Sequence, residues 1–199
     1  MYEEEITVSG VWFTSDTHYH HANICRGTSK WRDSNLTRDF DSISAMNDAL
    51  VGNINARVRQ EDVLYHLGDW SFGGVDKIEE FRRRLIVRRI HLILGNHDHH
   101  LADGRFNELF TSVQHYKEIE VEGRNIVLCH YAMRVWNGSH KGTWMLYGHS
   151  HGTILEHGMS MDVGVDTNHL LPYSFAEVKR RMQSLKPEIV DHHNELAHQ

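Results

Sequence analysis

The sequence is poor in cysteine and in long apolar runs. Its 199 residues include Cys25 and Cys129 as the only cysteines, without CxxC spacing, which predicts reduced thiols and not a disulfide framework. No apolar stretch approaches membrane-spanning length, and the first ten residues, MYEEEITVSG, lack the basic and apolar regions of a signal peptide. We therefore expect a cytoplasmic protein that has no membrane partner.

Basic residues are in the minority. Lys and Arg number 21 against 27 Asp and Glu, so the formal net charge is −6 with histidine neutral. A mildly acidic chain gains little attraction to nucleic acid or to anionic membranes. The arginines at 82–84 and 88–89 suggest nucleic-acid binding, but on the outer face of a helix such residues are more often solvated. Nucleic acid therefore stays an alternative partner and is not the favoured one.

Histidine is abundant, with 18 residues, and 40% of the chain is hydrophobic. A chain of this length and composition can bury one sizeable core. We predict a single domain over residues 1–186, followed by a polar tail at 187–199 that is expected to fray. The histidines of this tail, at 192, 193 and 198, need no functional role. No feature of the sequence predicts the oligomeric state.

The first half of the chain alternates short apolar runs with amphipathic segments. Strands are expected at 10–15, 63–67 and 90–94, and helices at 40–58 and 75–85. In both helical segments the apolar residues are three or four positions apart, which describes one face of a helix. The β-α-β-α-β order is typical of a doubly wound parallel sheet with right-handed crossovers.

The second half of the chain reads as strands followed by one helix. Strands are expected at 112–121, 125–130, 144–147 and 159–165, with a hairpin turn around Gly123. After Pro172, Ser174 and Glu177 have the spacing of a capping box and predict the start of a final helix. The chain as a whole predicts a layered α/β sandwich, with either one mixed sheet or two packed sheets.

Polar clusters follow five of the predicted strands, each where a strand ends: Asp16-Thr17-His18, Gly68-Asp69, Gly95-Asn96-His97-Asp98, His130 and Gly148-His149-Ser150-His151. Ligands bind at the carboxyl ends of strands in open α/β sheets, so the five clusters are expected to meet at one rim. In extended backbone, alternate residues point the same way. This predicts that Asp16 and His18 face one point, and likewise His149 and His151.

The donor atoms of these clusters are carboxylate oxygens, imidazole nitrogens and one amide oxygen, without a thiolate. This set suits Mn²⁺, Fe²⁺ or Zn²⁺ in a reactive site more than a structural zinc site. The ligands are too many for one ion. A pair of ions that shares a carboxylate would use all of them.

The order D-x-H, G-D, G-N-H-D, H and G-H-x-H resembles the calcineurin-like metallophosphoesterases. The first motif, FTSDTHYHHANI, is similar to that of the small stand-alone phage and bacterial members, and the resemblance covers roughly residues 10–155. It implies a metallophosphoesterase-like αββα sandwich, in which two mixed β-sheets are flanked by helices.

The resemblance also implies roles for individual residues. The metal ligands would be Asp16, His18 and His151 for one ion, Asn96, His130 and His149 for the other, and Asp69 as the bridge between them. His97 matches the general acid of the family, and Asp98 is expected to orient His97 or a ligand imidazole. The two divalent transition-metal ions would be Mn first, with Fe, Zn and Ni as alternatives.

One departure from the family concerns the grip on substrate. Larger members read G-D-x-x-D-R, with an Asp that supports the catalytic histidine and an Arg that holds phosphate, whereas residues 68–73 read GDWSFG. The candidates for substrate contact, chosen because they lie near motif residues in the sequence, are His21, Asn23, Arg26 and His140. Trp31, Trp136 and Trp144 leave two interpretations open, a groove for a nucleobase and aromatic core packing.

The resemblance implies a metal-dependent phosphoric ester hydrolase whose partner is a small phosphate ester. A hydroxide held between two ions would attack phosphorus in line, and His97 would protonate the departing oxygen. The absence of an obvious cap in the sequence favours small diesters or nucleotides, and thus a phosphodiesterase over a phosphomonoesterase. The alternatives are a nuclease acting on DNA or RNA and a non-enzymatic scaffold on the same fold, which predicts eroded ligands.

Overall fold

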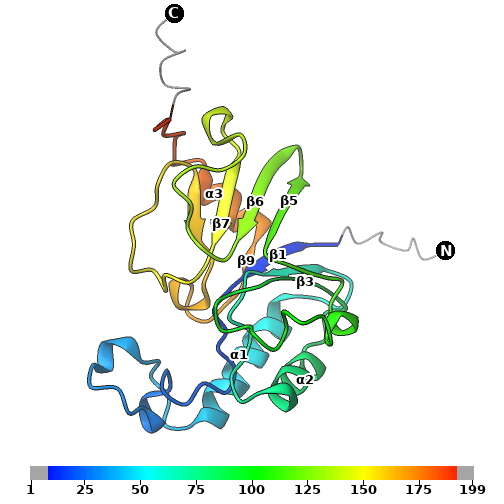
Figure 1. Ribbon diagram of the computed structural model, residues 1–199, viewed down its shortest axis with the longest axis vertical. Helices are drawn as coiled ribbons and strands as arrows, with labels where there is room; N and C mark the ends of the chain where they lie inside the picture. The colour runs from blue at the N-terminus through cyan, green and yellow to red at the C-terminus, as the bar shows by residue number, and fades with distance from the viewer. Residues whose placement is uncertain (1–8, 192–199) are drawn as a thin grey trace, which may run out of the picture.

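The centre of the molecule is a pair of β-sheets packed face to face, with helices around them (Figure 1). The computed structural model describes residues 9–191, so the first eight residues and most of the predicted tail, including its three histidines, lie outside the described residues. Both sheets are mixed. The α/β fold of two mixed sheets with flanking helices is therefore confirmed.

The first sheet has the strand order β4-β3-β2-β1-β9. Its strands are β1 (Val11–Thr14), β2 (Val63–His66), β3 (Arg89–Ile93), β4 (Ser112–Gln114) and β9 (Tyr173–Ser174). β1 to β4 are parallel to one another, and β9 pairs with β1 in the antiparallel direction. The parallel order puts the carboxyl ends of β1, β2 and β3 side by side at one edge of the sheet.

Two helices connect the parallel strands. α1 (Ile43–Arg57) begins after Ser42, whose side chain accepts a hydrogen bond from the Ala45 N–H, and α2 (Val75–Arg84) follows β2. Ile54 and Val58 of the predicted first face and Ile78 and Phe81 of the second pack with Leu64, Ile90 and Leu92 of the first sheet. The other predicted residues of the first face, Ile43, Met46 and Leu50, pack with Ile24 and Cys25. No helix in residues 9–191 is long and apolar enough to cross a membrane.

The second sheet has the strand order β5-β6-β7-β8. Its strands are β5 (Tyr116–Val121), β6 (Arg124–Cys129), β7 (Trp144–Tyr147) and β8 (Ser160–Asp162). β5 and β6 form the predicted antiparallel hairpin around Gly123, whereas β6, β7 and β8 are parallel. The carboxyl ends of β6 and β7 therefore also share one edge.

The core between the sheets is filled from both sides. α3 (Phe175–Met182) begins at Ser174 in the predicted capping box with Glu177 and buries its apolar face here. Alternate residues of the second sheet face in or out, as the strand period requires. The inward residues are Ile126, Leu128, Trp144 and Leu146, and the outward residues Val127, Cys129, Met145 and Tyr147 pack with Trp136.

Two strand predictions need correction. The single strand expected at 112–121 is two strands in different sheets, because the chain leaves the first sheet after Gln114 and enters the second at Tyr116. The strand expected at 159–165 is shorter, since β8 is followed by a 3₁₀ helix at Val165–Thr167. The two-residue strand β9 is not predicted, because so short a pairing has no sequence period.

The segment between β1 and α1 forms a lobe, drawn in blue in Figure 1, which we call the β1–α1 lobe (residues 19–42). It is irregular apart from the 3₁₀ helices Arg26–Thr28 and Ser34–Leu36. Ile24 and Cys25 anchor the lobe by packing with residues of α1 and with Val165. Two more 3₁₀ helices, Asn107–Leu109 and Ser139–Lys141, lie in the loops before β4 and before β7.

Candidate metal centre

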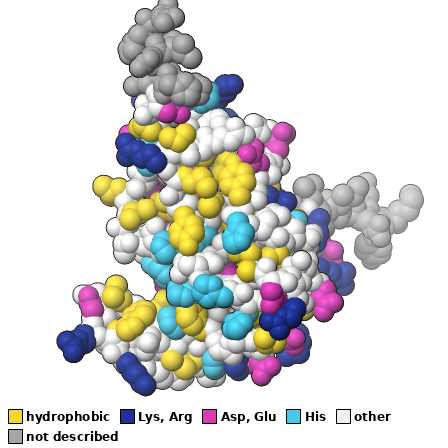
Figure 2. Space-filling model, in the orientation of Figure 1, with side chains coloured by type: hydrophobic (Ala, Val, Ile, Leu, Met, Phe, Trp, Pro, Cys, Tyr) yellow, Lys and Arg dark blue, Asp and Glu magenta, His cyan; other side chains and the backbone are white. Residues whose placement is uncertain are grey.

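The polar clusters that follow β1, β2, β3, β6 and β7 meet at one place. Figure 2 shows histidine side chains gathered in the middle of one face of the molecule. The candidate ligands form two groups, Asp16 with His18 and His151, and Asp69 with His130 and His149. The first group has two residues from the first sheet's loops and one from the second sheet's, and the second group has one from the first sheet's and two from the second sheet's. The centre therefore lies where the carboxyl ends of the strands of both sheets meet.

The first group has the spacing of ligands to a single ion. The Nε2 atoms of His18 and His151 are 3.2 Å apart, and each lies 3.9 Å from Asp16 Oδ1. Two atoms that each bind one ion at about 2.1 Å lie at most about 4.2 Å apart. All three distances are shorter than this limit, so one cation fits between the three side chains.

The second group is completed by the amide of Asn96. Its Oδ1 atom lies 3.0 Å from His130 Nε2 and 2.9 Å from His149 Nδ1. The ligand atoms of Asp69, His130 and His149 are within 4.8 Å of one another. The turn after β3 thus supplies a neutral oxygen to this group.

Asp69 lies between the two groups. Its Oδ2 atom is 3.5 Å from His18 Nε2 in the first group and 3.7 Å from His130 Nε2 in the second. Its Oδ1 atom accepts a hydrogen bond of 2.9 Å from the backbone N–H of His97. Asp69 is 2% exposed. The hydrogen bond fixes Oδ1, and Oδ2 faces the space between the two groups.

The hydrogen bonds around two histidines show that a cation fits this site. His130 Nδ1 lies 2.7 Å from the Leu67 carbonyl and His151 Nδ1 lies 2.6 Å from Asp166 Oδ2, so both Nδ1 atoms donate. In the neutral His130 ring the Nε2 atom then carries a lone pair, and it lies 3.0 Å from Asn96 Oδ1, which is also an acceptor. Burial would lower the pKa of His151, but its hydrogen bond to Asp166 and the nearby Asp16 raise it. Burial lowers the pKa of His130 and so favours its neutral ring. A metal ion between His130 Nε2 and Asn96 Oδ1 would satisfy both acceptors.

The electrostatics of the buried residues lead to the same conclusion. Burial raises the pKa of Asp16 to about 7, although His151 acts in the opposite direction, and the neighbouring Asp69 raises it further. Burial also lowers the pKa of His18 well below its usual value. The protein alone therefore disfavours charge on both side chains, whereas a bound cation would stabilise the carboxylate and the neutral imidazole together.

The backbone that presents these residues is left-handed, and not extended as their spacing predicts. The φ angles are 55° for Asp16, 46° for His18, 66° for His149 and 48° for His151. This conformation costs about 1–2 kcal/mol for a residue with a side chain and is concentrated at functional sites. Asp16 and His18 face one point as predicted, whereas His149 and His151 belong to different groups, so that prediction is wrong.

Gly148 lets the second sheet's loop approach the first sheet. A Cβ atom at this position would lie 2.0 Å from Ser15 Oγ and 2.5 Å from Asp16 Oδ2. The next N–H, of His149, donates to both oxygens of Asp16 at 3.0 and 2.9 Å. A side chain at 148 would break this contact, which joins the loops that follow β1 and β7.

Asp98 binds the backbone of two loops, and its expected role in orienting an imidazole stays a prediction. Its carboxylate accepts hydrogen bonds of 2.8 to 2.9 Å from the N–H groups of Asp69, Trp70 and Gly95. These bonds join the loop after β2 to the turn after β3. Asp98 therefore connects the loops that carry Asp69 and Asn96, and its catalytic role stays a prediction.

His97 is exposed at the edge of the centre. Its ring centroid lies 5.6 Å from that of His18 and 4.8 Å from that of Phe72. Phe72 stands where larger family members have the Asp of G-D-x-x-D-R, and it also stacks on His21 at 3.8 Å. An aromatic ring thus packs against His97 in place of the supporting carboxylate.

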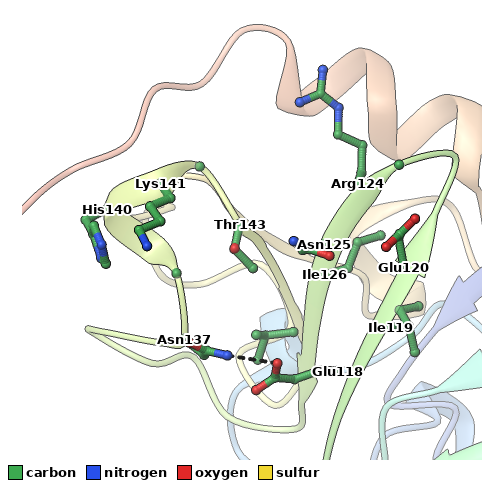
Figure 3. A pocket seen from close by; sticks show the side chains of 14 residues that line it. Glu118, Ile119, Glu120, Arg124, Asn125, Ile126, Asn137, His140, Lys141 and Thr143 are labelled. Carbon is green, nitrogen blue, oxygen red and sulfur yellow. Dashed lines mark hydrogen bonds between the residues drawn. The ribbon is translucent and has the colours of Figure 1, made fainter.

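The four candidates for substrate contact lie in different places. His21 is at the centre, 5.4 Å from the His18 ring. Asn23 Oδ1 accepts from the Lys30 N–H within the β1–α1 lobe, and Arg26 pairs with Asp39 there. His140 lies in a different cavity, of about 530 Å³, between the β5–β6 hairpin and the loop before β7 (Figure 3). The structure thus places His21 at the centre and His140 away from it.

A partly buried ion pair that the sequence did not predict lies beside the first group. The Arg38 guanidinium binds Asp166 through Nε at 2.7 Å and Nη2 at 2.8 Å, and it donates to the carbonyls of Asp16 and Thr17. Burial would raise the pKa of Asp166, but the bonds from Arg38 and His151 outweigh it and hold the pKa below its usual range. Asp166 lies shortly after β8, which is the only signal that could have marked it.

The comparisons with known proteins agree with this geometry. A sequence model of the calcineurin-like phosphoesterase superfamily domain matches residues 11–161, a range that contains all seven candidate ligands. The chain is 28% identical over 184 residues to the uncharacterised protein MJ1445 of Methanocaldococcus jannaschii, covering 92% of this chain and 84% of that protein. It is also 28% identical over 192 residues to the gene 66 protein of Mycobacterium phage D29, covering 81% and 90% respectively.

Among solved structures, the protein of unknown function AQ665 from Aquifex aeolicus has a similar fold. Its TM-score is 0.65 at 24% identity, over 87% of this chain and 100% of that chain. At this level of identity the likeness concerns the fold alone.

Proposed function

Because the chain belongs to the calcineurin-like phosphoesterase superfamily, we propose that it hydrolyses phosphate esters, preferring diesters, with two divalent metal ions at the centre. The observation that carries the proposal is the place of Asp69, whose Oδ2 atom faces both groups of candidate ligands. A single carboxylate between two ligand sets is the arrangement that a pair of ions requires.

The chain's own residues divide into two ligand sets. The first ion would be held by Asp16, His18 and His151, the second by Asn96, His130 and His149, and both by Asp69. When bound, the ions would activate a water molecule and withdraw charge from the phosphoryl oxygens. The nitrogen and oxygen donors suit Mn first, with Fe, Zn or Ni as alternatives.

His97 would donate a proton to the leaving oxygen. The hydrogen bond from its backbone N–H to Asp69 ties the residue to the bridging carboxylate, while its ring stays exposed at the edge of the centre. Phe72 packs against one side of the His97 ring and so restricts its orientation toward a substrate. Proton donation by a positioned histidine is a common contribution to ester cleavage.

The charge around the centre supports diesters over monoesters. A phosphomonoester dianion brings one more negative charge than a diester. Arg38 lies beside the centre, and its guanidinium donates hydrogen bonds to Asp166 and to two backbone carbonyls. The guanidinium is therefore already neutralised and offers no phosphate clamp.

The arginines of α2 give little support to the nuclease alternative. Arg83 pairs with Glu79 and Arg84 with Asp48, and the Arg82 guanidinium donates to the Leu109 carbonyl. Such engaged side chains have fewer hydrogen-bond donors available for a nucleic-acid backbone, and the net charge of −6 opposes its approach.

Metal analysis and turnover together test the proposal. The purified protein, reconstituted with Mn²⁺, is expected to hold two ions per chain and to cleave bis(p-nitrophenyl) phosphate faster than p-nitrophenyl phosphate. EDTA should abolish both reactions. His151→Ala should lose metal, whereas His157→Ala, a matched change at a histidine that pairs with Glu188 outside the centre, should not. One ion or none after reconstitution would contradict the two-ion centre, and two ions without turnover would favour the scaffold alternative.

A further inference from the structure

A cavity of about 840 Å³ opens beside the metal centre. On one side it is lined by the candidate ligands His149 and His151, and on the other by the β1–α1 lobe. A molecule in this cavity can therefore touch the centre and the lobe at once. The volume is within the range of about 300–1,000 Å³ that is typical of small-molecule sites.

The lobe presents apolar side chains to this cavity. Trp31 is 42% exposed and Leu36 is 57% exposed, and both line the cavity together with Ile24, Phe40 and Leu170. Figure 2 shows hydrophobic side chains on the lobe close to the histidines of the centre. Trp31 also makes an edge-to-face contact with His21, with 5.7 Å between ring centroids, which links it to the centre. A ligand that covers this exposed apolar surface removes it from water, which favours binding.

Each Lys, Arg, Asp or Glu among the described residues of the cavity lining has an ion-pair partner, which for Asp39 is Arg26 outside the lining. Within the lining, Arg38 pairs with Asp166. A second phosphate or a carboxylate would meet no uncompensated Lys or Arg there. Asn35, Ser150 and Thr153 add neutral polar groups to the lining. The cavity thus suits an uncharged group with a flat apolar face and a polar edge.

We propose that this cavity binds the organic group of the substrate, and that this group is uncharged, aromatic and of nucleoside size, with its ring stacked on Trp31. The inference rests on the proposed function, because the phosphoryl group would lie at the metal centre. It makes Trp31 and Leu36 residues that determine specificity. It also excludes polyphosphates and long nucleic acids as preferred substrates, since both carry further charges into a neutral cavity.

A pair of ligands that differ by a base alone tests the proposal. AMP and ribose 5-phosphate are compared as competitive inhibitors of bis(p-nitrophenyl) phosphate hydrolysis by the metal-loaded full chain. AMP is expected to bind about 5- to 100-fold more tightly, as stacking of one base on an aromatic side chain provides. Trp31→Ala and Leu36→Ala should reduce this ratio toward one, whereas Trp31→Phe should keep most of it. Inhibition by inorganic phosphate should be the same in all variants.

The chain offers matched controls for these variants. Tyr116→Ala removes an aromatic ring that is 40% exposed, and Ile86→Ala an aliphatic side chain that is 50% exposed, both outside the cavity lining. Neither should change the ratio. Equal inhibition by AMP and ribose 5-phosphate, or a ratio that Trp31→Ala leaves unchanged, would overturn the proposal. Tighter binding of ADP or ATP than of AMP would overturn its neutral character.

Failure of the proposed function has a different signature. A parent protein that holds no metal and cleaves no ester contradicts the phosphoesterase proposal. Calorimetric titration with the same two ligands then tests the cavity without turnover. Preferential binding of AMP that Trp31→Ala removes would still support the cavity, and equal or absent binding would overturn it.

Discussion

At the scale of single residues, Asp69 differs from the other candidate ligands, because one of its oxygens faces both groups. Each other candidate ligand belongs to one group. The consequences of replacing Asp69 should therefore differ in kind from those of replacing a ligand such as His149.

Asp69→Asn is expected to reduce the affinity for both ions by more than the roughly 10–100-fold that the loss of an outer partner costs. The amide removes negative charge from the space between the groups. His149→Ala is the matched comparison, since His149 is exposed and belongs to the second group alone. Elemental analysis and turnover of both variants check this order. An Asp69→Asn protein with two ions and near-normal turnover would show that the carboxylate is no bridge.

His97→Ala is expected to leave metal content unchanged and to slow turnover in a way that depends on the leaving group. Loss of a general acid costs about 10²–10⁴-fold when the leaving oxygen needs a proton. A nitrophenolate leaves without one and should be little affected. The measurement is a series of phosphate esters with rising leaving-group pKa, in parent and variant, with the exposed His100→Ala as control. A uniform decrease across the series would make His97 a positioning residue, and loss of metal would make it a ligand.

His66 should make the protein less stable as the pH decreases. It is fully buried, its Nε2 atom lies 2.9 Å from Thr17 Oγ1, and its Nδ1 atom accepts from the Gly68 N–H. Burial lowers its pKa from 6.5 to about 3, and the nearby His130 adds to the effect. Between pH 6.5 and about 3, His66 is protonated in the unfolded chain and neutral in the folded chain. Stability is therefore lost as pH falls, by up to about 1.4 kcal/mol per pH unit.

Replacing His66 tests this contribution. Gln does not titrate, so His66→Gln abolishes the difference in proton binding at this position. The unfolding free energy of the variant should therefore decrease less steeply than that of the parent from pH 6.5 to 4. Urea unfolding of the metal-free proteins at several pH values measures the slopes. The same substitution at exposed His100 is the control. Parallel curves for parent and His66→Gln would show that His66 is protonated in the folded state.

At the scale of elements, the loops after β2 and β3 act as one unit because Asp98 accepts three backbone N–H groups from them. Burial raises the pKa of Asp98, but the bonds from Gly95, Trp70 and Asp69 act in the opposite direction. The carboxylate thus keeps the Asp69 and Asn96 loops in place from outside the ligand shell.

Asp98→Ala is expected to lower the unfolding free energy by about 2–5 kcal/mol, since several buried N–H groups lose their acceptor. Asp98→Asn should cost less, because one carbonyl oxygen remains. Denaturant unfolding measures both, and Asp103→Ala at an exposed aspartate is the control. A stable Asp98→Ala protein that has lost turnover alone would instead indicate a direct chemical role.

At the scale of the whole molecule, the centre joins the two sheets. Asp16, His18, Asp69 and Asn96 follow strands of the first sheet, and His130, His149 and His151 follow strands of the second. Bound metal would therefore connect loops that otherwise meet through the shared core and contacts such as that of His149 with Asp16.

Metal is expected to stabilise the entire fold. An ion at 100 times its dissociation constant adds about 2.7 kcal/mol, which for a chain of this length raises the melting temperature by about 5–10 °C. Calorimetry with Mn²⁺ and with EDTA measures the shift, and His151→Ala should reduce it. A melting temperature that is independent of metal would show that the two sheets are not coupled through the centre.

The sequence by itself determined those features that depend on neighbours along the chain. The apolar spacing of α1 and α2, the capping box at Ser174 and the hairpin at Gly123 are local patterns, and the structure contains each of them. The order of the five polar clusters also pointed to the phosphoesterase family, which the family match confirms. The extent of the domain, 1–186, and the roles of the ligands stay predictions.

Only the tertiary structure decided features that depend on partners far apart in the chain. The run at 112–121 keeps one alternation of side chains, so nothing local shows that its two halves pair with different sheets. Likewise, Arg38 meets Asp166 across 128 positions, and Asp98 bonds to a loop 28 and 29 positions away. His140 is close to the motifs in sequence but lies in another cavity. Such contacts form because folding brings distant backbone together, and a pattern within one segment carries no record of them.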